Sequence, residues 1–196
     1  MKKTLLLVSS IVLASTANAG VNGNSDGVEF KVSNNAAEIN LTRMIISSDA
    51  AINTRFNYSD VERKVFDGGI GVSTTIEQNN TDIMIGASVN GMGQKDENDK
   101  RLDLVYGAIE LGAFYHLNKE IKLGGNISVS PSSLTFGDAI NVIRMDVSGG
   151  YNFESFAGAG IKVGYSYTKI SGIKDKYVGK DLDNIQYPYI SVWFNF

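Results

Sequence analysis

The sequence of 196 residues contains no cysteine, one histidine, one tryptophan and two prolines. The absence of cysteine excludes disulfide bonds and thiolate metal sites. After Ala19 there is no apolar run near the ~20 residues that a transmembrane helix needs. If the rest of the chain crosses a membrane, it must therefore do so as a closed β-barrel, because an open sheet would leave backbone polar groups unpaired in lipid.

The first 19 residues have the features of a secretory signal. Two lysines precede an apolar stretch from Leu5 to Ala14, and residues 17–19 (Ala-Asn-Ala) fit the small-x-small rule for cleavage. We expect residues 1–19 to be removed and residues 20–196 to form one domain. The processed chain would carry 16 basic and 21 acidic residues. This acidic balance gives no basic surface for nucleic acid, so we expect no nucleic-acid partner.

Apolar and polar residues alternate along most of the chain, as in strands with two different faces. A soluble sandwich also alternates. Three features favour an up-and-down antiparallel transmembrane barrel instead. The polar faces are rich in Gly and Ser, the strands approach the 9–11 residues that cross a bilayer, and aromatic residues gather near strand ends. The pattern predicts strands at 50–59, 65–77, 82–93, 101–117, 120–130, 139–153, 157–171 and 184–196.

Residues 28–43 allow two interpretations. Apolar residues take even positions from Val28 to Val32 and odd positions from Ala37 to Leu41. A tight turn at Asn34 and Asn35 would explain the switch, because Asn tolerates positive φ. The alternative is one bulged strand. Since outer-membrane barrels have an even number of strands, we favour ten strands over eight.

The connections between the predicted strands alternate in length. Residues 118–120 and 154–156 are short, whereas 94–100, 131–138 and 172–183 are longer and polar. Outer-membrane barrels have short periplasmic turns and longer outer loops. We therefore expect Phe196 to lie at the periplasmic end.

The C-terminal strand resembles the C-terminal signal of outer-membrane barrels, which ends in an aromatic residue preceded by apolar residues at every second position. The matching residues are Ile190, Val192, Phe194 and Phe196. The whole chain is similar in size to the YfaZ family of small outer-membrane proteins, and also resembles it in the terminal strand with Pro188 and Tyr189 and in the loop that begins at Pro131.

The resemblance implies a barrel exported through a cleaved signal peptide to the outer membrane of a Gram-negative cell, with no established catalytic residues. Such a barrel would contact outer-membrane lipids and lipopolysaccharide. During insertion it would meet periplasmic chaperones and the barrel-assembly machinery.

His116 is the single candidate for a catalytic base. Its position in the alternation places it inside the barrel, next to the short turn at 118–120 and hence at the periplasmic end. The barrel proteases and lipid A deacylases place their chemistry near the outer end. Asn118 also stands where a deacylase would have serine. We therefore expect no enzyme, no catalytic site, and no metal or cofactor.

The charges that the alternation places inside the barrel carry both signs. Unpaired charges are costly to bury, so a mixed set predicts a paired network that fills the lumen. Eight to ten strands leave little more than room for side chains. A structural or interaction role is therefore favoured over a narrow channel for ions or small solutes, and both over a lipid-modifying enzyme. The predicted network comprises Glu38, Arg55, Glu110, Lys122, Arg144, Asp146 and Lys162.

Overall fold

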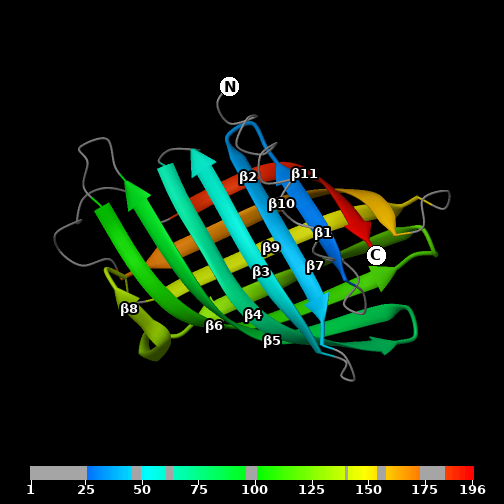
Figure 1. The fold of residues 1–196 in the computed structure, drawn as a ribbon, viewed down its shortest axis with the longest axis horizontal. Coiled ribbons are helices and arrows are strands. Elements are labelled where there is room, and N and C mark those ends of the chain that lie inside the picture. The colour runs from blue at the N-terminus through cyan, green and yellow to red at the C-terminus, as the bar shows by residue number, and fades with distance from the viewer. Residues whose placement is uncertain are drawn as a thin grey trace.

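The computed structural model describes residues 26–45, 50–60, 64–95, 101–139, 141–153, 158–172 and 184–196. They form a closed antiparallel barrel of ten strands, with one short extra strand and one 3-10 turn in a loop (Figure 1). The elements are β1 (Gly27–Val32), β2 (Ala36–Met44), β3 (Ala50–Asp60), β4 (Lys64–Gln78), β5 (Thr81–Lys95), β6 (Arg101–His116), β7 (Ile121–Ser130), η1 (Ser132–Leu134), β8 (Thr135–Gly137), β9 (Asn141–Asn152), β10 (Ala159–Ser171) and β11 (Asn184–Asn195).

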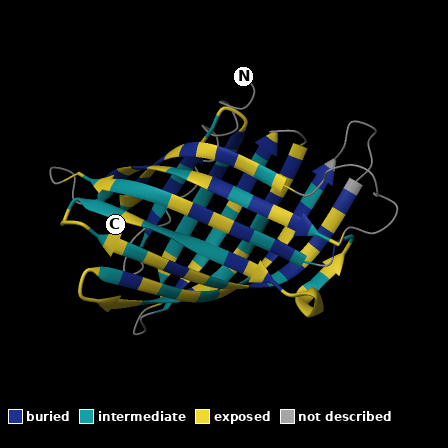
Figure 2. Cartoon of the chain, turned by 180° about the vertical axis from the view of Figure 1, so that it is seen from behind, coloured by how far each residue is buried: buried dark blue, intermediate teal, exposed yellow. Residues whose placement is uncertain are grey.

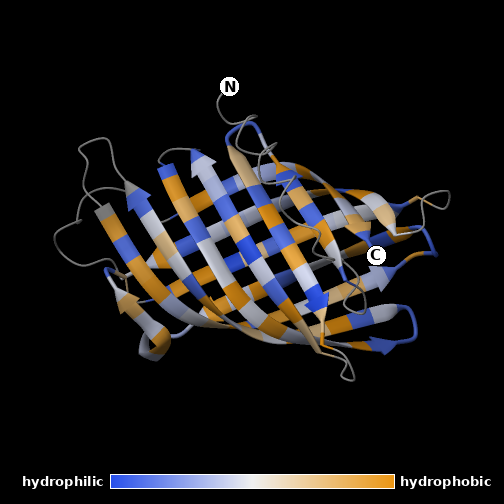
Figure 3. Cartoon of the chain, viewed as in Figure 1, coloured by the Kyte–Doolittle hydropathy of each residue, from blue (hydrophilic) through white to orange (hydrophobic). Residues whose placement is uncertain are grey.

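Each strand exposes one row of side chains and buries the other (Figure 2). The exposed row is mainly apolar, whereas many of the buried side chains are charged, Ser, Thr or Asn, so the usual arrangement of a soluble protein is inverted (Figure 3). An apolar outside around a polar inside is the pattern of an outer-membrane barrel. Among the described residues, no helix is long and apolar enough to span a membrane. Residues 1–19 lie outside the described residues, so the expected cleavage after Ala19 stays a prediction.

All eight strands expected from the alternation are confirmed, with ends within two residues of those predicted. The ten-strand alternative is also confirmed, because residues 28–43 form β1 and β2 as separate strands. The turn between them closes with a hydrogen bond from Ser33 N to Ala36 O at 2.8 Å. The expectation that this turn depends on positive φ at Asn34 and Asn35 was wrong. Among the described residues other than glycine, Asn79 has positive φ (56°) and Asn34 and Asn35 do not.

The two ends of the barrel differ in their connections. We call one the turn end, which holds the hairpin at Asn79 and Asn80, the turn at 117–120 and Phe196. The opposite end, which holds the connection between β7 and β9, is called the loop end. At the turn end, Asn118 Oδ1 accepts hydrogen bonds from the backbone N–H groups of Glu120 and Ile121, at 2.9 and 2.6 Å. The expected turn at 154–156 and most of the loops at 94–100 and 172–183 lie outside the described residues.

The loop expected at 131–138 contains structure that the sequence did not indicate. β8 pairs with Leu104–Tyr106 of β6, after the 3-10 turn η1. The cause lies in strand length, because β6 pairs with β7 between Ile109 and His116 and extends beyond it. The loop folds back and supplies partners to this otherwise unpaired edge, which limits edge exposure.

The barrel closes where β1 meets β2. The hydrogen-bonded order of the strands is β1-β11-β10-β9-β7-β6-β5-β4-β3-β2, so this junction joins the two ends of the sheet. Besides the turn at Ser33, side-chain hydrogen bonds bridge it. Asn40 Nδ2 lies 3.3 Å from Glu29 Oε2, and Asp26 Oδ1 accepts a hydrogen bond of 2.5 Å from the backbone N–H of Met44.

Aromatic side chains on the outer face lie near both ends. Tyr58 and Phe66 pack together near the loop end, with ring centroids 4.9 Å apart. Tyr151 and Phe153 do so near the turn end, at 5.8 Å. Two aromatic girdles that flank an apolar band are expected at the two membrane interfaces.

The middle of this band should not tolerate a charge. Val72 lies on the outer face about halfway along β4, whereas Gln78 lies on the same strand and face at the turn end. We expect Val72→Lys to destabilise the barrel by about 2–4 kcal/mol and Gln78→Lys by about 0–1 kcal/mol. Urea unfolding in lipid vesicles measures both. Equal effects would contradict the placement of the band.

Candidate functional site

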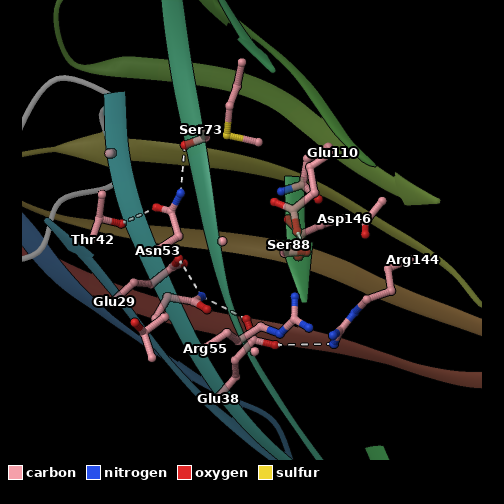
Figure 4. Close-up of a pocket in the computed structure, with 18 of the residues that line it drawn as sticks. Glu29, Glu38, Thr42, Asn53, Arg55, Ser73, Ser88, Glu110, Arg144 and Asp146 are labelled. Atoms are coloured by element: carbon pink, nitrogen blue, oxygen red, sulfur yellow. Dashed lines mark hydrogen bonds and ion pairs between the residues drawn. The ribbon is translucent and has the colours of Figure 1, made fainter. Parts of the chain in front are cut away.

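Many charged side chains are buried in the interior of the barrel. A cavity of about 200 Å³ lies inside, and we call it the chamber. Figure 4 shows polar side chains converging on it from several strands. Five basic and five acidic residues line the chamber, so the lining carries no net formal charge. They include all seven residues of the network expected from the sequence, namely Glu38, Arg55, Glu110, Lys122, Arg144, Asp146 and Lys162.

Among the described residues, Arg144 of β9 and Asp67 of β4 form the most buried ion pair. Arg144 Nη1 donates to Asp67 Oδ2, and its Nη2 lies 4.0 Å from Glu38 Oε2 (Figure 4). Asp67 also accepts from Arg55 Nη2 and from the Tyr106 hydroxyl, both at 3.4 Å. A buried carboxylate with several charged or hydroxyl donors is tolerated because its lone pairs are satisfied.

Lys31 connects three strands from the seam where the barrel closes. Its Nζ lies 3.0 Å from Glu38 Oε1 on β2 and 3.1 Å from Asp146 Oδ2 on β9. The ammonium also lies 4.8 Å from the ring centroid of Tyr189, whose hydroxyl donates to Asp146 at 2.7 Å. This group therefore connects the β1–β2 seam to β9, which is separated from β1 by β10 and β11.

Lys162 and Glu29 form a second link between strands that are not hydrogen-bonded to each other. Lys162 Nζ on β10 lies 2.5 Å from Glu29 Oε1 on β1, across β11. Ser191 of β11 donates a hydrogen bond of 2.7 Å to the same carboxylate. The interior charges thus act as cross-links between strands.

The alternation identified inward-facing charges but not their partners. Arg144 and Asp146 share one strand and one face, yet each pairs with another strand. Glu110 accepts a hydrogen bond of 2.5 Å from Ser88.

Four acidic or basic residues of the interior were missed by the sequence analysis. The same alternation could have found them, since Asp67 and Asp82 continue the inward rows of β4 and β5. The missed residues are Glu29, Lys31, Asp67 and Asp82.

His116 lies where the sequence placed it, inside the barrel near the turn end. Its Nε2 lies 2.8 Å from Asp82 Oδ2, and Lys122 Nζ lies 2.5 Å from the same oxygen. Lys122 also lies 4.9 Å from the ring centroid of Phe114. Asp82 therefore has two basic partners, an arrangement that stabilises a carboxylate. Within the described part of the chain, no group of three or more His, Asp or Glu residues has the geometry to hold a metal.

A second, apolar layer lies inside the barrel at the loop end. Its side chains come from β4, β5, β6, β9 and β10 and from the loop before β9, and they form one contiguous cluster. Ile185 of β11 packs against it and also against Ala36, Tyr187 and Tyr189, which extends the contact to β2. We call this cluster the septum. It consists of Val65, Met92, Leu102, Leu104, Tyr106, Ala108, Ala139, Val142 and Ile170.

The septum residues are buried. Leu102 is 1% exposed and Ile170 is fully buried, although both lie near an end of the barrel. None of the septum residues lines the chamber. The chamber therefore lies on the turn-end side of the septum. A packed apolar layer of this kind opposes the passage of ions, because an ion would lose its hydration there.

The residues of the expected C-terminal signal point away from the chamber. Ile190, Val192, Phe194 and Phe196 are all on the outer face, with exposures from 39% to 70%. The alternate residues of β11 face inward, and Trp193 packs against Gly150 and Gly160. A role of the four outward residues in barrel assembly stays a prediction.

Comparison with known families identifies the chain. The sequence model described as YfaZ precursor matches residues 1–196. The chain belongs to the YfaZ precursor family. The apolar outer face and polar interior agree with this assignment, and the protein is an outer-membrane β-barrel. No curated protein matched the chain.

Several solved structures are similar to this chain. The KdgM porin has 12% sequence identity, covers 88% of this chain and 99% of its own, and gives a TM-score of 0.44. The NanC porin has 10% identity with the same coverages and TM-score. The outer-membrane protein OmpT of Vibrio cholerae has 13% identity, covers 82% of this chain and 55% of its own, and gives 0.37. At these sequence identities and TM-scores, the structural similarities do not indicate what this chain binds or transports.

The pairing of Arg144 with Asp67 can be tested by a double-mutant cycle. Arg144→Met leaves a buried carboxylate short of its main partner, so we expect a loss of about 3–5 kcal/mol in unfolding free energy. Asp67→Leu combined with Arg144→Met should recover most of it, since Glu38 keeps its ion pair with Lys31 and Arg55 keeps its hydrogen bond to Asn90. Urea unfolding in vesicles measures the coupling, and Glu110→Gln serves as a control with a small expected effect. Additivity of the two changes would show that the residues do not interact.

The arrangement around Asp82 predicts a mild effect for His116→Ala. Lys122 remains to pair with Asp82, so we expect the unfolding free energy to fall by about 1 kcal/mol or less. Lys122→Met should cost clearly more, because it removes the shorter contact. The reverse order would show that His116, and not Lys122, stabilises Asp82.

Proposed function

We propose that this protein is a closed, non-enzymatic barrel with a structural or interaction role in the outer membrane. The septum is the observation that carries the proposal. Ten strands form a lumen that side chains can fill, and here the loop end is filled by apolar groups in contact from several walls. A barrel blocked in this way does not provide an aqueous path for solutes.

The charges of the chamber support the same proposal. Pores that select ions do so with rings of one sign of charge or with ordered carbonyl groups. The chamber instead has equal numbers of basic and acidic residues, and several of them are paired across strands. Such ion pairs cross-link the strands of the barrel wall, which fits a structural role better than a conduction pathway.

A lipid-modifying activity receives no support from the site. In the described part of the chain, the imidazole of His116 forms its hydrogen bond with Asp82, and no hydroxyl nucleophile accompanies it. An imidazole without a neighbouring nucleophile cannot perform acyl transfer by the usual route.

A narrow gated channel is the second candidate, and one observation favours it. Ser59 Oγ and Gln94 Oε1 are buried without hydrogen-bond partners, and the strand register places Ser59, Val65, Gln94 and Leu102 in one row. Buried unsatisfied polar atoms cost roughly 1–3 kcal/mol each. That cost would be relieved if the septum opened and water entered.

Conductance of refolded protein in planar bilayers distinguishes the two functions. We expect the wild type to remain silent and Leu102→Ser combined with Leu104→Ser to conduct, because polar groups would admit water to the septum. Lys162→Gln, which changes the chamber alone, should stay silent. Steady conductance of the wild type would overturn the closed-barrel proposal. Voltage-induced openings that disappear in Ser59→Ala and Gln94→Leu would favour the gated channel.

A further inference from the structure

The ion pairs of the chamber are distributed unevenly among its acidic residues. Five acidic residues line the chamber, and the five basic residues of the lining are two arginines and three lysines. Both arginines contact Asp67, which is not part of the lining. Arg55 Nη2 lies 3.4 Å from Asp67 Oδ2, and Arg144 Nη1 donates to the same oxygen. The three lysines are therefore the closer partners of the five carboxylates that line the chamber.

Glu110 of β6 is the carboxylate that this pairing leaves over. Within the described structure, the three lysines form four ion pairs with the lining carboxylates, namely Lys162–Glu29 at 2.5 Å, Lys122–Asp82 at 2.5 Å, Lys31–Glu38 at 3.0 Å and Lys31–Asp146 at 3.1 Å. Glu110 has no ion pair with any described residue, although it faces the same chamber. A carboxylate without a counterion inside a barrel is a place where a bound cation would be stabilised.

A chain of hydrogen bonds holds the side chain of Glu110 from one side. Ser88 Oγ donates to Glu110 Oε1 at 2.5 Å, and Asn90 Nδ2 donates to Ser88 Oγ at 2.9 Å. Arg55 Nη2 in turn donates to Asn90 Oδ1 at 2.8 Å. Figure 4 shows Ser88 next to Glu110. The chain positions Oε1 of Glu110, whereas its Oε2 has no hydrogen bond to the described residues.

Two uncharged polar side chains lie beside Glu110 on β7. The register places Ser128 opposite Glu110 and Asn126 opposite Gly112, and both side chains line the chamber. Neither has a side-chain hydrogen bond to another described residue. Their side-chain oxygens can accept hydrogen bonds, as can Oε2 of Glu110. One carboxylate and two neutral oxygens on adjacent strands form an acceptor set for a group with one positive charge and several N–H donors.

Apolar side chains continue the same wall towards the turn end. Met84 of β5 and Phe114 of β6 line the chamber there, and an added Cβ at Gly112 would meet both at 3.2 Å. The lining extends to Asp82, the second residue of β5, so the chamber reaches the turn end of the barrel. A solute that enters from the turn end passes Met84 and Phe114 before it reaches Glu110.

We propose that the chamber binds the primary ammonium group of a small amine at Glu110, with Ser128 and Asn126 as further acceptors. A primary ammonium carries three N–H donors, and its hydrogen bond to a carboxylate is stronger than one between neutral groups. A short apolar stem on the amine lies against Met84 and Phe114. A divalent metal ion fits less well, because the described residues include no group of three or more His, Asp or Glu side chains that could hold one.

The test uses the full refolded barrel in detergent micelles, with isotope-labelled methionine methyl groups observed by NMR. Met84 lines the chamber and Met92 belongs to the septum, so their methyl signals report on different layers of the lumen. Titration with n-butylammonium chloride should shift the Met84 signal in a saturable manner and leave the Met92 signal unchanged. Glu110→Gln should weaken this binding at least about tenfold, because a hydrogen bond between charged groups is lost.

Three controls accompany the titration. Glu120→Gln removes the same charge from the turn end of the barrel, outside the chamber lining, and should leave the affinity unchanged. Ser128→Ala should weaken binding by a factor of roughly two to ten, which is the contribution of a neutral hydrogen bond. Tetramethylammonium carries the charge without an N–H donor, so it should bind at least about tenfold more weakly than butylammonium.

Several outcomes would overturn this proposal. They are the absence of a saturable Met84 shift, an unchanged affinity in Glu110→Gln, and equal affinities for butylammonium and tetramethylammonium. Glu110→Gln is expected to have a small effect on stability, and Ser128→Ala tests the same site without changing any charge. The titration involves no ion flow, so its failure would leave the closed-barrel proposal intact, and conductance of the wild type would not decide whether the chamber binds an amine.

Discussion

The pairing of backbone groups is the constraint on which the rest of this structure depends. In lipid, every backbone N–H and C=O of a spanning strand needs a partner, and a sheet achieves this by closing on itself. Nine of the ten contacts between neighbouring strands are hydrogen-bonded ladders, which run in order from β1 through β11 to β2. The tenth, between β1 and β2, is joined by its hairpin and by interior side chains, of which the Lys31–Glu38 pair at 3.0 Å is central. The interior charges are therefore part of how the barrel closes.

The sequence contained enough to derive the barrel, because alternation with period 2 is set by the strand itself. Val28 to Val32 and Ala37 to Leu41 switch parity across a turn, and this switch alone distinguished ten strands from eight. The mechanism assigned to the turn was wrong, since positive φ occurs at Asn79 and not at Asn34 or Asn35. Turn geometry depends on local hydrogen bonds, such as that between Ser33 and Ala36, which composition does not determine.

The partners in the interior could not be derived in the same way. Alternation gives the face of a residue but not its position around the barrel, which depends on the stagger of all ten strands. Arg144 therefore meets Asp67, which is 77 positions away in the chain, although Asp146 is nearer in sequence. The septum was hidden for a related reason. Along β6, the apolar Leu104 faces inward and the apolar Val105 faces outward. Where both faces of a strand are apolar, polar and apolar residues do not alternate in the sequence, so the inward apolar residues could not be recognised.

The closed-barrel proposal has a consequence for where the specificity of this protein would lie. A lumen with balanced charges exerts little net attraction on ions of either sign, and a closed septum would oppose their transfer even if they enter. Under this proposal, selection of a partner would depend on surfaces that solvent or lipid can reach. β8 illustrates this, because it pairs with the edge of β6 and exposes Phe136. The interior ion pairs connect β1 to β2, β9 and β10, and a wall connected in this way holds its outer residues in register.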